Sequence, residues 1–172
     1  MASALDRLKI QYFIAGGVAA RYYGVPRMTI DVDIAIQKLE KEVALKLLDV
    51  LCKKDRRLKQ EKALKILTEG GILRVDWMDV TTVDLIVGWA PDFFRRVKKD
   101  RETGLKIISP EDLILSKLES IKKCKVETAR WKDVEDIQVL LNTRRLDLKY
   151  LWKKAEQLGV SSLLKKFFKK IR

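Results

Sequence analysis

The chain has 172 residues, of which 47% are hydrophobic, and it carries a formal net charge of +13. This length suits one compact domain with a small helical lobe, and the apolar content is sufficient for a hydrophobic core. Histidine is absent, which excludes Ser-His and Cys-His nucleophiles and His-ligated zinc sites within the chain. Any chemistry must therefore rest on carboxylates, lysines, arginines, hydroxyls and a hard metal ion.

The distribution of charge and hydropathy bears on partners and location. No apolar run approaches the roughly 18 residues that a membrane-spanning helix needs, and the N-terminal residues lack a signal-peptide pattern. We therefore expect a cytoplasmic protein without membrane contact. Residues 143–172 hold ten Lys and Arg against two acids. Such a concentration of positive charge favours a polyanionic partner such as RNA or DNA, although a basic surface that only promotes solubility is the alternative.

The first predicted elements surround a pair of glycines. Tyr12–Ala15 is expected to be a buried strand, Gly16-Gly17 interrupts it, and Val18–Tyr23 has helical composition. A turn follows at Gly24–Arg27, because Pro26 cannot continue a helix.

The next segment, Thr29–Ile36, alternates between apolar and other residues, which predicts a strand. Its apolar face holds Ile30, Val32, Ile34 and Ile36. Asp31 and Asp33 share the opposite face with Ala35, since successive side chains of a strand point to opposite sides.

The middle of the chain predicts an amphipathic helix over Leu39–Lys54, with apolar residues at helical spacing. Gly70-Gly71 precedes a predicted strand Ile72–Met78, and Thr81–Val87 is its expected antiparallel neighbour. A short helix is expected over Phe93–Lys99.

The last part of the chain is predicted to be helical. Ser109-Pro110-Glu111-Asp112 is a strong helix start, and that helix should run to about Lys123. Further helices are expected over Trp131–Asn142, Leu148–Leu158 and Ser161–Ile171, the last with its apolar face packed on the protein. The fold class is therefore α/β (α+β), a short mixed sheet flanked by helices, with a core at residues 1–108 and a helical portion at 109–172.

Asp31 and Asp33 are the first candidates for chemistry. Two carboxylates one residue apart on a strand lie about 6.6–6.8 Å apart at the backbone and point the same way. They repel one another, and a pair of Mg²⁺ ions would resolve that repulsion and activate a hydroxyl beside a triphosphate. An exposed edge strand that uses charge to prevent aggregation is the alternative. Upstream, Gly16 and Gly17 offer backbone N–H groups to phosphate oxygens at a strand-to-helix turn.

The segment GGVAARYYGVPRMTIDVDI resembles the signature of nucleotidyltransferases of the DNA polymerase beta superfamily. It is most similar to the small branch that includes the abortive-infection (AbiEii-like) toxin nucleotidyltransferases. The matching residues are Gly16, Gly17, Gly24, Pro26, Arg27, Thr29, Asp31 and Asp33. The resemblance implies a nucleotide site at Gly16, Gly17, Arg27 and Thr29, a Mg²⁺ site (with Mn²⁺ as a substitute) at the two acids, and a protein partner such as an antitoxin.

Later residues complete the resemblance. A third metal-binding acid is implied on a later strand, where Asp84 in TTVDLIVG is preferred and Asp76 in LRVDWM is the competitor. Lys117 and Lys132 are the basic candidates in the closing helices, with Lys117 expected near the nucleotide. Asp133 and Asp136 lie three residues apart on one helix face, and salt bridges to Lys132 or Arg130 are the structural explanation for them.

The function expected from these residues is transfer of a nucleoside monophosphate from a nucleoside triphosphate to an acceptor hydroxyl, with RNA, including tRNA, as a candidate acceptor. Asp31, Asp33 and Asp84 would be the catalytic, metal-binding residues, and the basic C-terminal helices would contact the RNA. The alternative is a non-catalytic module that keeps the fold and binds RNA or a protein.

Overall fold

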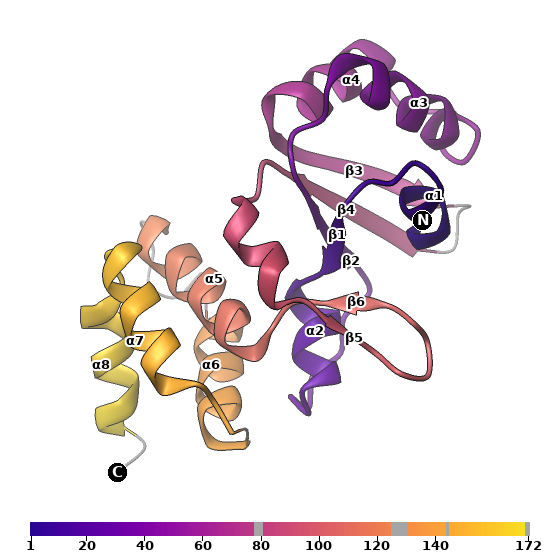
Figure 1. Ribbon diagram of the computed structural model, residues 1–172. Helices are drawn as coiled ribbons and strands as arrows, with labels where there is room; N and C mark the ends of the chain where they lie inside the picture. The colour runs from indigo at the N-terminus through magenta and orange to yellow at the C-terminus, as the bar shows by residue number, and fades with distance from the viewer. Residues whose placement is uncertain (78–80, 125–130, 144, 171–172) are drawn as a thin grey trace. The chain divides into compact units, whose positions relative to one another are not determined.

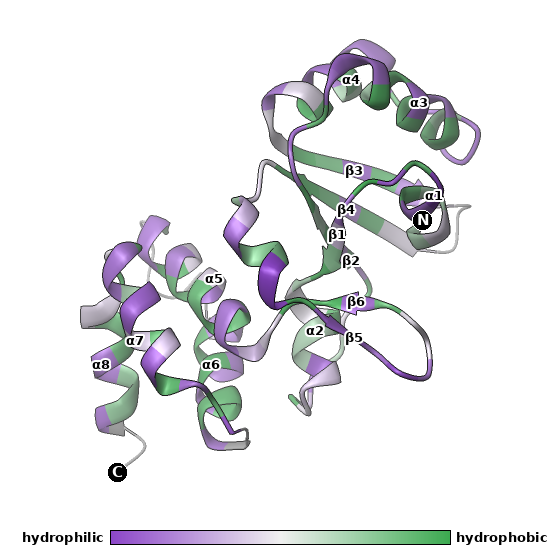
Figure 2. Ribbon diagram, viewed as in Figure 1, coloured by the Kyte–Doolittle hydropathy of each residue, from purple (hydrophilic) through white to green (hydrophobic). Residues whose placement is uncertain are grey.

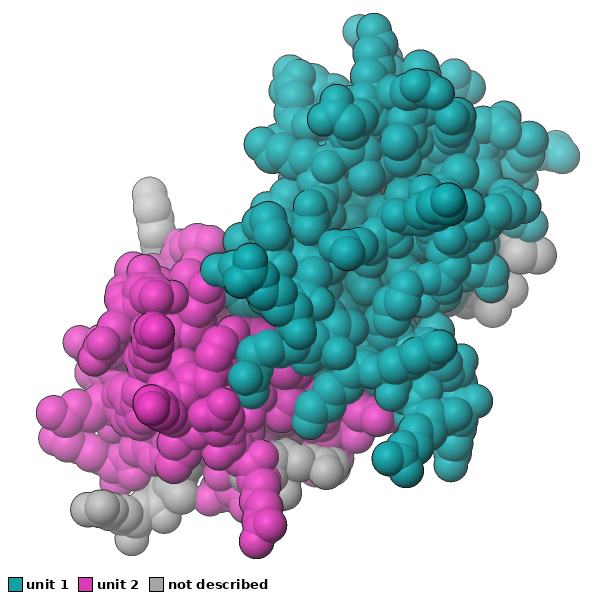
Figure 3. Space-filling model, viewed as in Figure 1, with its two compact units in different colours: residues 1–18, 28–108 teal, residues 19–27, 109–172 magenta. Residues whose placement is uncertain are grey.

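The computed structural model describes residues 1–77, 81–124, 131–143 and 145–170 (Figure 1). The chain divides into two compact units, each described separately below (Figure 3). Unit 1 comprises residues 1–18 and 28–108, and unit 2 comprises residues 19–27 and 109–172. The predicted strand end at Met78 and helix end at Ile171 lie outside the described residues, as does Arg130.

Unit 1 is built on a mixed sheet, as predicted. Its described strands are ordered β3-β4-β2-β1-β6-β5. Their bounds are β1 Tyr12–Ile14, β2 Val32–Ile36, β3 Gly71–Trp77, β4 Thr81–Val87, β5 Lys98–Lys99 and β6 Lys106–Ile107. The β2–β4 and β1–β6 pairs are parallel, and the other neighbours are antiparallel, including the predicted pair of β3 and β4. The parallel β2–β4 pair sets the two strands that carry the candidate acids side by side.

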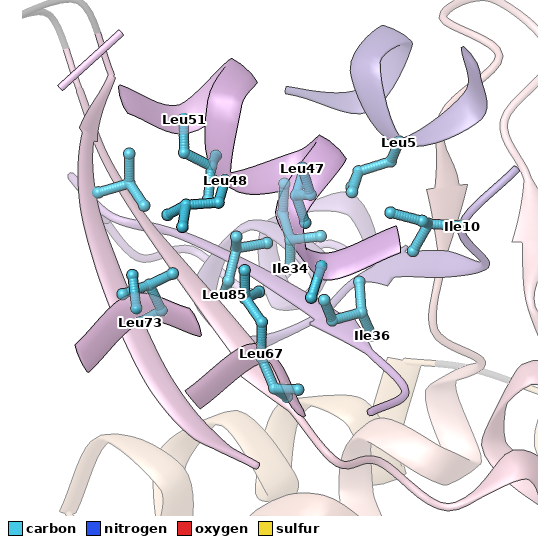
Figure 4. Packing of buried hydrophobic residues seen from close by; sticks show 14 of the residues in the cluster. Leu5, Ile10, Ile34, Ile36, Leu47, Leu48, Leu51, Leu67, Leu73 and Leu85 are labelled. Carbon is cyan, nitrogen blue, oxygen red and sulfur yellow. The ribbon is translucent and has the colours of Figure 1, made fainter. Parts of the chain in front are cut away.

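The hydrophobic core of unit 1 lies between one face of this sheet and three helices, α1 (Ala2–Arg7), α3 (Lys41–Cys52) and α4 (Gln60–Glu69). Figure 4 shows side chains from these helices packed against residues of β2, β3 and β4. The predicted amphipathic helix is confirmed in α3, whose buried residues are Ala44, Leu47, Leu48 and Leu51. On β4, Val83, Leu85 and Val87 face the core as predicted. Because these positions alternate along the strand, Asp84 points to the other face of the sheet.

Two local assignments from the sequence were wrong. The strand expected over Thr29–Ile36 begins only at Val32, and Ile30 is 81% exposed instead of lying in the core. The Thr81 hydroxyl donates a hydrogen bond to the Ile30 carbonyl, so this segment is attached to the start of β4 without strand pairing. The helix expected over Phe93–Lys99 is a 3-10 helix, η1 (Pro91–Arg96), followed by β5. Alternation over the eight residues of Thr29–Ile36 cannot locate where pairing with a neighbour starts.

Unit 2 is helical, as predicted for the end of the chain. Its elements are the C-terminal part of α2 (Gly16–Tyr22), α5 (Pro110–Lys123), α6 (Trp131–Thr143), α7 (Leu148–Gln157) and α8 (Ser161–Lys170). The Ser109 hydroxyl caps α5 by accepting a hydrogen bond from the Asp112 N–H at 3.1 Å, which confirms the predicted helix start.

The last helix has an apolar side that packs within unit 2, as expected. Hydrophobic and hydrophilic residues alternate along α8 (Figure 2). Leu164 and Phe167 are buried, and the Phe168 ring stacks on Trp152 of α7 with a centroid separation of 5.4 Å. Within the described parts of the chain, no helix is both long enough and apolar enough to span a membrane.

Candidate active site

Asp33 and Asp84 are direct neighbours in the parallel pair β2–β4 and point to the same face of the sheet. They occupy the same register position, so their Cα atoms are about 4.8 Å apart, the normal spacing of neighbouring strands. Both lie on the sheet face opposite the core formed by α3 and α4, since Ile34 and Leu85 point into that core. Asp84 is 9% exposed, and Asp33 is half-buried. Two carboxylates that lie this close repel one another unless a cation is near.

Gly16 lies against the Asp33 carboxylate. Its φ is +55°, and a Cβ placed on it would overlap Asp33 Oδ2. The adjacent Ala15 N–H donates a hydrogen bond to the Asp33 carbonyl at 2.9 Å. The turn between β1 and α2 is therefore held against β2, and only glycine permits this approach at position 16. Gly17 follows in the first turn of α2.

Asp31 lies immediately before β2 and is half-buried. The Thr29 hydroxyl donates a hydrogen bond to the Asp31 carbonyl at 3.2 Å. Thr29 therefore shapes the backbone that leads to the acids, a role that the sequence alone does not show. Met28 and Ile30, on either side of Thr29, are 91% and 81% exposed.

Arg74 of β3 is paired with Asp84. Its Nε and Nη2 donate hydrogen bonds to Asp84 Oδ1 and Oδ2 at 2.9 and 2.8 Å. These bonds and the Asp84 charge raise the pKa of Arg74, and the charges of Asp31 and Asp76 contribute further. The sequence analysis did not identify Arg74, although a signal existed. The predicted antiparallel pairing of β3 with β4 sets the one basic residue of β3 on the strand beside Asp84, and the observed register places it directly opposite that acid.

Asp76, the competitor for the third acid, lies elsewhere on the sheet. Asp76 lies on β3, opposite Thr82 of β4. Strand β4, which carries Asp84, therefore separates Asp76 from Asp33 of β2. Its carboxylate accepts a hydrogen bond from Arg57 Nη2 at 2.6 Å, and its own N–H donates to Asp55. Asp84 is therefore the acid that β-sheet register places beside Asp33.

The later candidates form an ion cluster inside unit 2. Lys117 Nζ lies 2.6 Å from Asp136 Oδ2 and 3.0 Å from Asp133 Oδ1, and Arg27 Nη1 lies 2.6 Å from the same Asp136 oxygen. The side chains of Lys117 and Asp136 are 6% and 2% exposed. Salt bridging to Lys132 or Arg130 was expected for the two acids; the described partners are Lys117 and Arg27, and Arg130 lies outside the described residues. Lys132 lies over the Trp131 ring, 5.5 Å from its centroid.

The predicted site residues thus fall in two groups. Gly16, Gly17, Thr29, Asp31, Asp33 and Asp84 belong to unit 1, whereas Arg27 and Lys117 belong to unit 2. The first group matches the chemistry of a Mg²⁺ site, because carboxylate oxygens are the hard ligands that Mg²⁺ prefers. In this arrangement both oxygens of Asp84 face Arg74. No three acidic or cysteine side chains among the described residues are clustered closely enough to hold a metal ion.

The fold has counterparts among solved structures. The solution structure of the antibiotic-resistance factor ANT(2'')-Ia superimposes with a TM-score of 0.53 over 99% of this chain and 90% of that chain, at 13% identity. An antigenic nucleotidyltransferase-like protein from Paracoccidioides brasiliensis is 22% identical, with a TM-score of 0.49 over 81% of this chain and 71% of that one. At 13% identity the likeness to ANT(2'')-Ia shows the fold alone. No curated protein sequence matches the chain.

The family comparison is more specific. The model of the family "Nucleotidyl transferase AbiEii toxin, Type IV TA system" matches residues 2–165, which include most of both units and all the candidate site residues. The resemblance seen in the sequence is thereby confirmed. The chain belongs to the AbiEii family of nucleotidyl transferase toxins from type IV toxin–antitoxin systems.

Proposed function

We propose that the protein transfers a nucleoside monophosphate from a nucleoside triphosphate to an acceptor hydroxyl, with Asp31, Asp33 and Asp84 as the metal-binding acids. The observation that carries this proposal is the register match of Asp33 with Asp84, on a sheet face where Gly16 abuts Asp33. Acids that served only to pair with bases would not require a glycine against one of them.

In this proposal the three acids hold Mg²⁺ (or Mn²⁺), which supplies charge neutralisation and activation of the acceptor hydroxyl. The chain's own residues do the positioning. Gly16 lies against Asp33 with Gly17 next to it in the first turn of α2, and backbone N–H groups at such a turn are suited to phosphate oxygens. Thr29 fixes the backbone before Asp31. Arg27 and Lys117 stay predictions as phosphate contacts, since each is paired with Asp136 in the structure.

Incubation of the protein with an α-labelled nucleoside triphosphate, Mg²⁺ and total cellular RNA tests this proposal. Asp84→Asn should abolish label transfer, whereas Asp76→Asn should retain most of it if Asp84 is the third acid. Labelling lost in Asp76→Asn and kept in Asp84→Asn would reverse that assignment. Equal labelling by the wild type and Asp33→Asn would refute the proposed chemistry and favour a module that only binds RNA or a protein.

We further propose RNA as the acceptor, because α7 and α8 present positive charge to solvent. Their exposed lysines are Lys149, Lys153, Lys165, Lys166 and Lys169. Because RNA binding releases counterions from the backbone, its affinity falls with salt concentration in proportion to the number of phosphate contacts. The apolar side of α8 is packed against α7, so the basic side is the one available to a partner.

The variant Lys165→Gln/Lys166→Gln/Lys169→Gln tests this surface. Removal of each lysine that contacts a phosphate should reduce the salt dependence of RNA binding, the slope of log K against log [salt], by about one. The matched control is Lys41→Gln/Lys62→Gln/Lys65→Gln, which removes three exposed lysines from α3 and α4. Equal slopes for the two triple variants would exclude α8 as the RNA contact.

The family also makes an antitoxin the expected protein partner, which co-purification with the product of a neighbouring gene would test.

A further inference from the structure

Arg74 occupies the position that a cation would need beside the candidate acids. It lies opposite Asp84 in the β3–β4 pair and binds both carboxylate oxygens with two nitrogens of its guanidinium group. Asp31 and Asp76 are close enough to interact electrostatically with the same group. Asp33 is the register neighbour of Asp84 on the other side. The guanidinium therefore lies among acids of β3, of β4 and of the segment before β2.

The exposure of the two partners differs greatly. The Arg74 side chain is 66% exposed, whereas that of Asp84 is 13% exposed. An exposed arginine on an edge strand contributes little to fold stability through a salt bridge. The buried partner depends on the arginine more, because a buried carboxylate without a counter-ion is unfavourable. The pair thus fixes and neutralises Asp84 while leaving Arg74 able to move away.

A divalent cation at Asp84 would meet this arginine directly. Both Asp84 oxygens already accept a charge-assisted hydrogen bond, and a guanidinium cannot lose its proton in a protein. A metal ion and the guanidinium would therefore repel one another at the same carboxylate, so that one cation has to leave before the other can bind.

We propose that Arg74 is a positioning residue that holds Asp84 as an internal counter-ion, and that a divalent cation has to displace it for Asp84 to join the metal site. This inference rests on the proposed function of Asp31, Asp33 and Asp84. Displacement leaves an unpaired guanidinium beside the acids, where a phosphate of the bound nucleotide is a suitable new partner.

Titration with Mn²⁺ alone, followed by electron paramagnetic resonance, tests the inference without relying on activity. Arg74→Gln removes the charge while keeping a polar side chain, and it should tighten Mn²⁺ binding about tenfold through lost repulsion. Arg74→Lys keeps the charge, and its affinity should stay within about threefold of wild type. The matched control is Arg57→Gln. It removes the arginine paired with Asp76, which lies on β3 like Arg74, and it should leave the Mn²⁺ affinity unchanged.

The outcomes separate the two proposals. Tighter Mn²⁺ binding by Arg74→Gln, with Arg57→Gln and Arg74→Lys near wild type, supports the counter-ion role, since a damaged fold would weaken binding. Equal affinity of Arg74→Gln and Arg57→Gln would overturn the inference and leave the metal site intact. Weaker binding by Arg74→Gln would likewise overturn it. Absence of Mn²⁺ binding in every protein would overturn the proposed metal site and the inference together.

Discussion

The two groups of acids in this molecule are organised in opposite ways. In unit 1, Asp33 and Asp84 lie side by side on a sheet face, with one half-exposed to solvent and the other paired to an exposed arginine. In unit 2, Asp136 is 2% exposed and lies 2.6 Å from both Lys117 and Arg27. The first arrangement places two acids beside one exposed arginine, whereas the second surrounds a buried acid with two bases.

The contrast shows how burial and charge balance separate functional from structural acids. Clustered like charges destabilise a fold, and they persist where a ligand uses them. A buried acid with matched bases holds helices together, and removing one member leaves a buried charge behind. We therefore expect the acids of unit 1 to matter for activity and those of unit 2 to matter for stability.

The largest expected effect concerns Asp33. Asp33→Asn should lower the rate of nucleotidyl transfer by about 10³-fold or more, or roughly 4 kcal/mol of transition-state stabilisation, because a metal ligand is lost. The free energy of unfolding should change by less than about 1 kcal/mol. Asp49→Asn is the control, since Asp49 is exposed on α3 and pairs only locally with Lys53. Initial rates with labelled nucleotide and urea unfolding measure the two quantities.

The next effect in size should come from Asp136. Asp136→Ala should lower the free energy of unfolding by about 3 kcal/mol, since Arg27 and Lys117 lose a buried partner. The value is at the low end for buried pairs because Lys117 keeps Asp133. Glu42→Ala, which breaks the exposed pair with Lys46, should leave the free energy of unfolding close to the wild-type value. A small loss of stability with abolished transfer would instead place Asp136 with the active-site acids.

Much of unit 1 was predictable because its signals are local. Each of three signals is contained within a dozen residues: the alternation around Asp31 and Asp33, the Gly16-Gly17 turn, and the helix periodicity of α3. The sheet class and the antiparallel pairing of β3 with β4 followed from the same patterns. The short strands β5 and β6 left no such signal, since two residues carry no period.

Long-range pairings were beyond the sequence. Asp84 and Asp33 are 51 residues apart in the chain, and the partnership of Arg27 with Asp136 joins residues separated by 109 positions. Charge pattern alone suggested local partners for Asp136, whereas packing of the helices in unit 2 brings Lys117 and Arg27 to it. Arg74 was missed for a different reason: it lies only ten residues from Asp84 in the chain, but its position opposite that acid depends on the exact register of β3 against β4.

A third test concerns the glycine beside Asp33. Gly16→Ala introduces a Cβ that overlaps Asp33 Oδ2 at a positive φ, so it should lower the free energy of unfolding by about 2 kcal/mol and also reduce transfer. Gly104→Ala is the control, because Gly104 has φ +69° but its nearest neighbour, Lys99 Cε, is 3.8 Å from the added atom. Gly104→Ala should therefore show strain without lost transfer. Equal transfer rates for the two variants would separate Gly16 from the site.

The smallest expected effect compares one tyrosine–aspartate hydrogen bond from each unit. In unit 2 the Tyr150 hydroxyl donates to Asp112 at 2.6 Å, and Asp112 is fully buried. Tyr150→Phe should lower the free energy of unfolding by about 1.5 kcal/mol, because a buried carboxylate loses a donor while keeping Ser109. In unit 1 the Tyr12 hydroxyl lies 3.4 Å from Asp6, whose side chain is 50% exposed, so Tyr12→Phe should cost less than about 0.5 kcal/mol.

Urea unfolding of the two phenylalanine variants, followed by circular dichroism, measures this difference directly. Both should keep wild-type transfer rates, because neither tyrosine lies in the group formed by Asp31, Asp33 and Asp84. Equal losses of stability would contradict the view that unit 2 depends on its buried acids more than unit 1 does on its exposed ones. A loss of transfer in Tyr150→Phe without a loss of stability would extend the active site into unit 2. This pair of variants therefore tests the contrast between the acids of the two units through single hydrogen bonds, the weakest of the interactions compared.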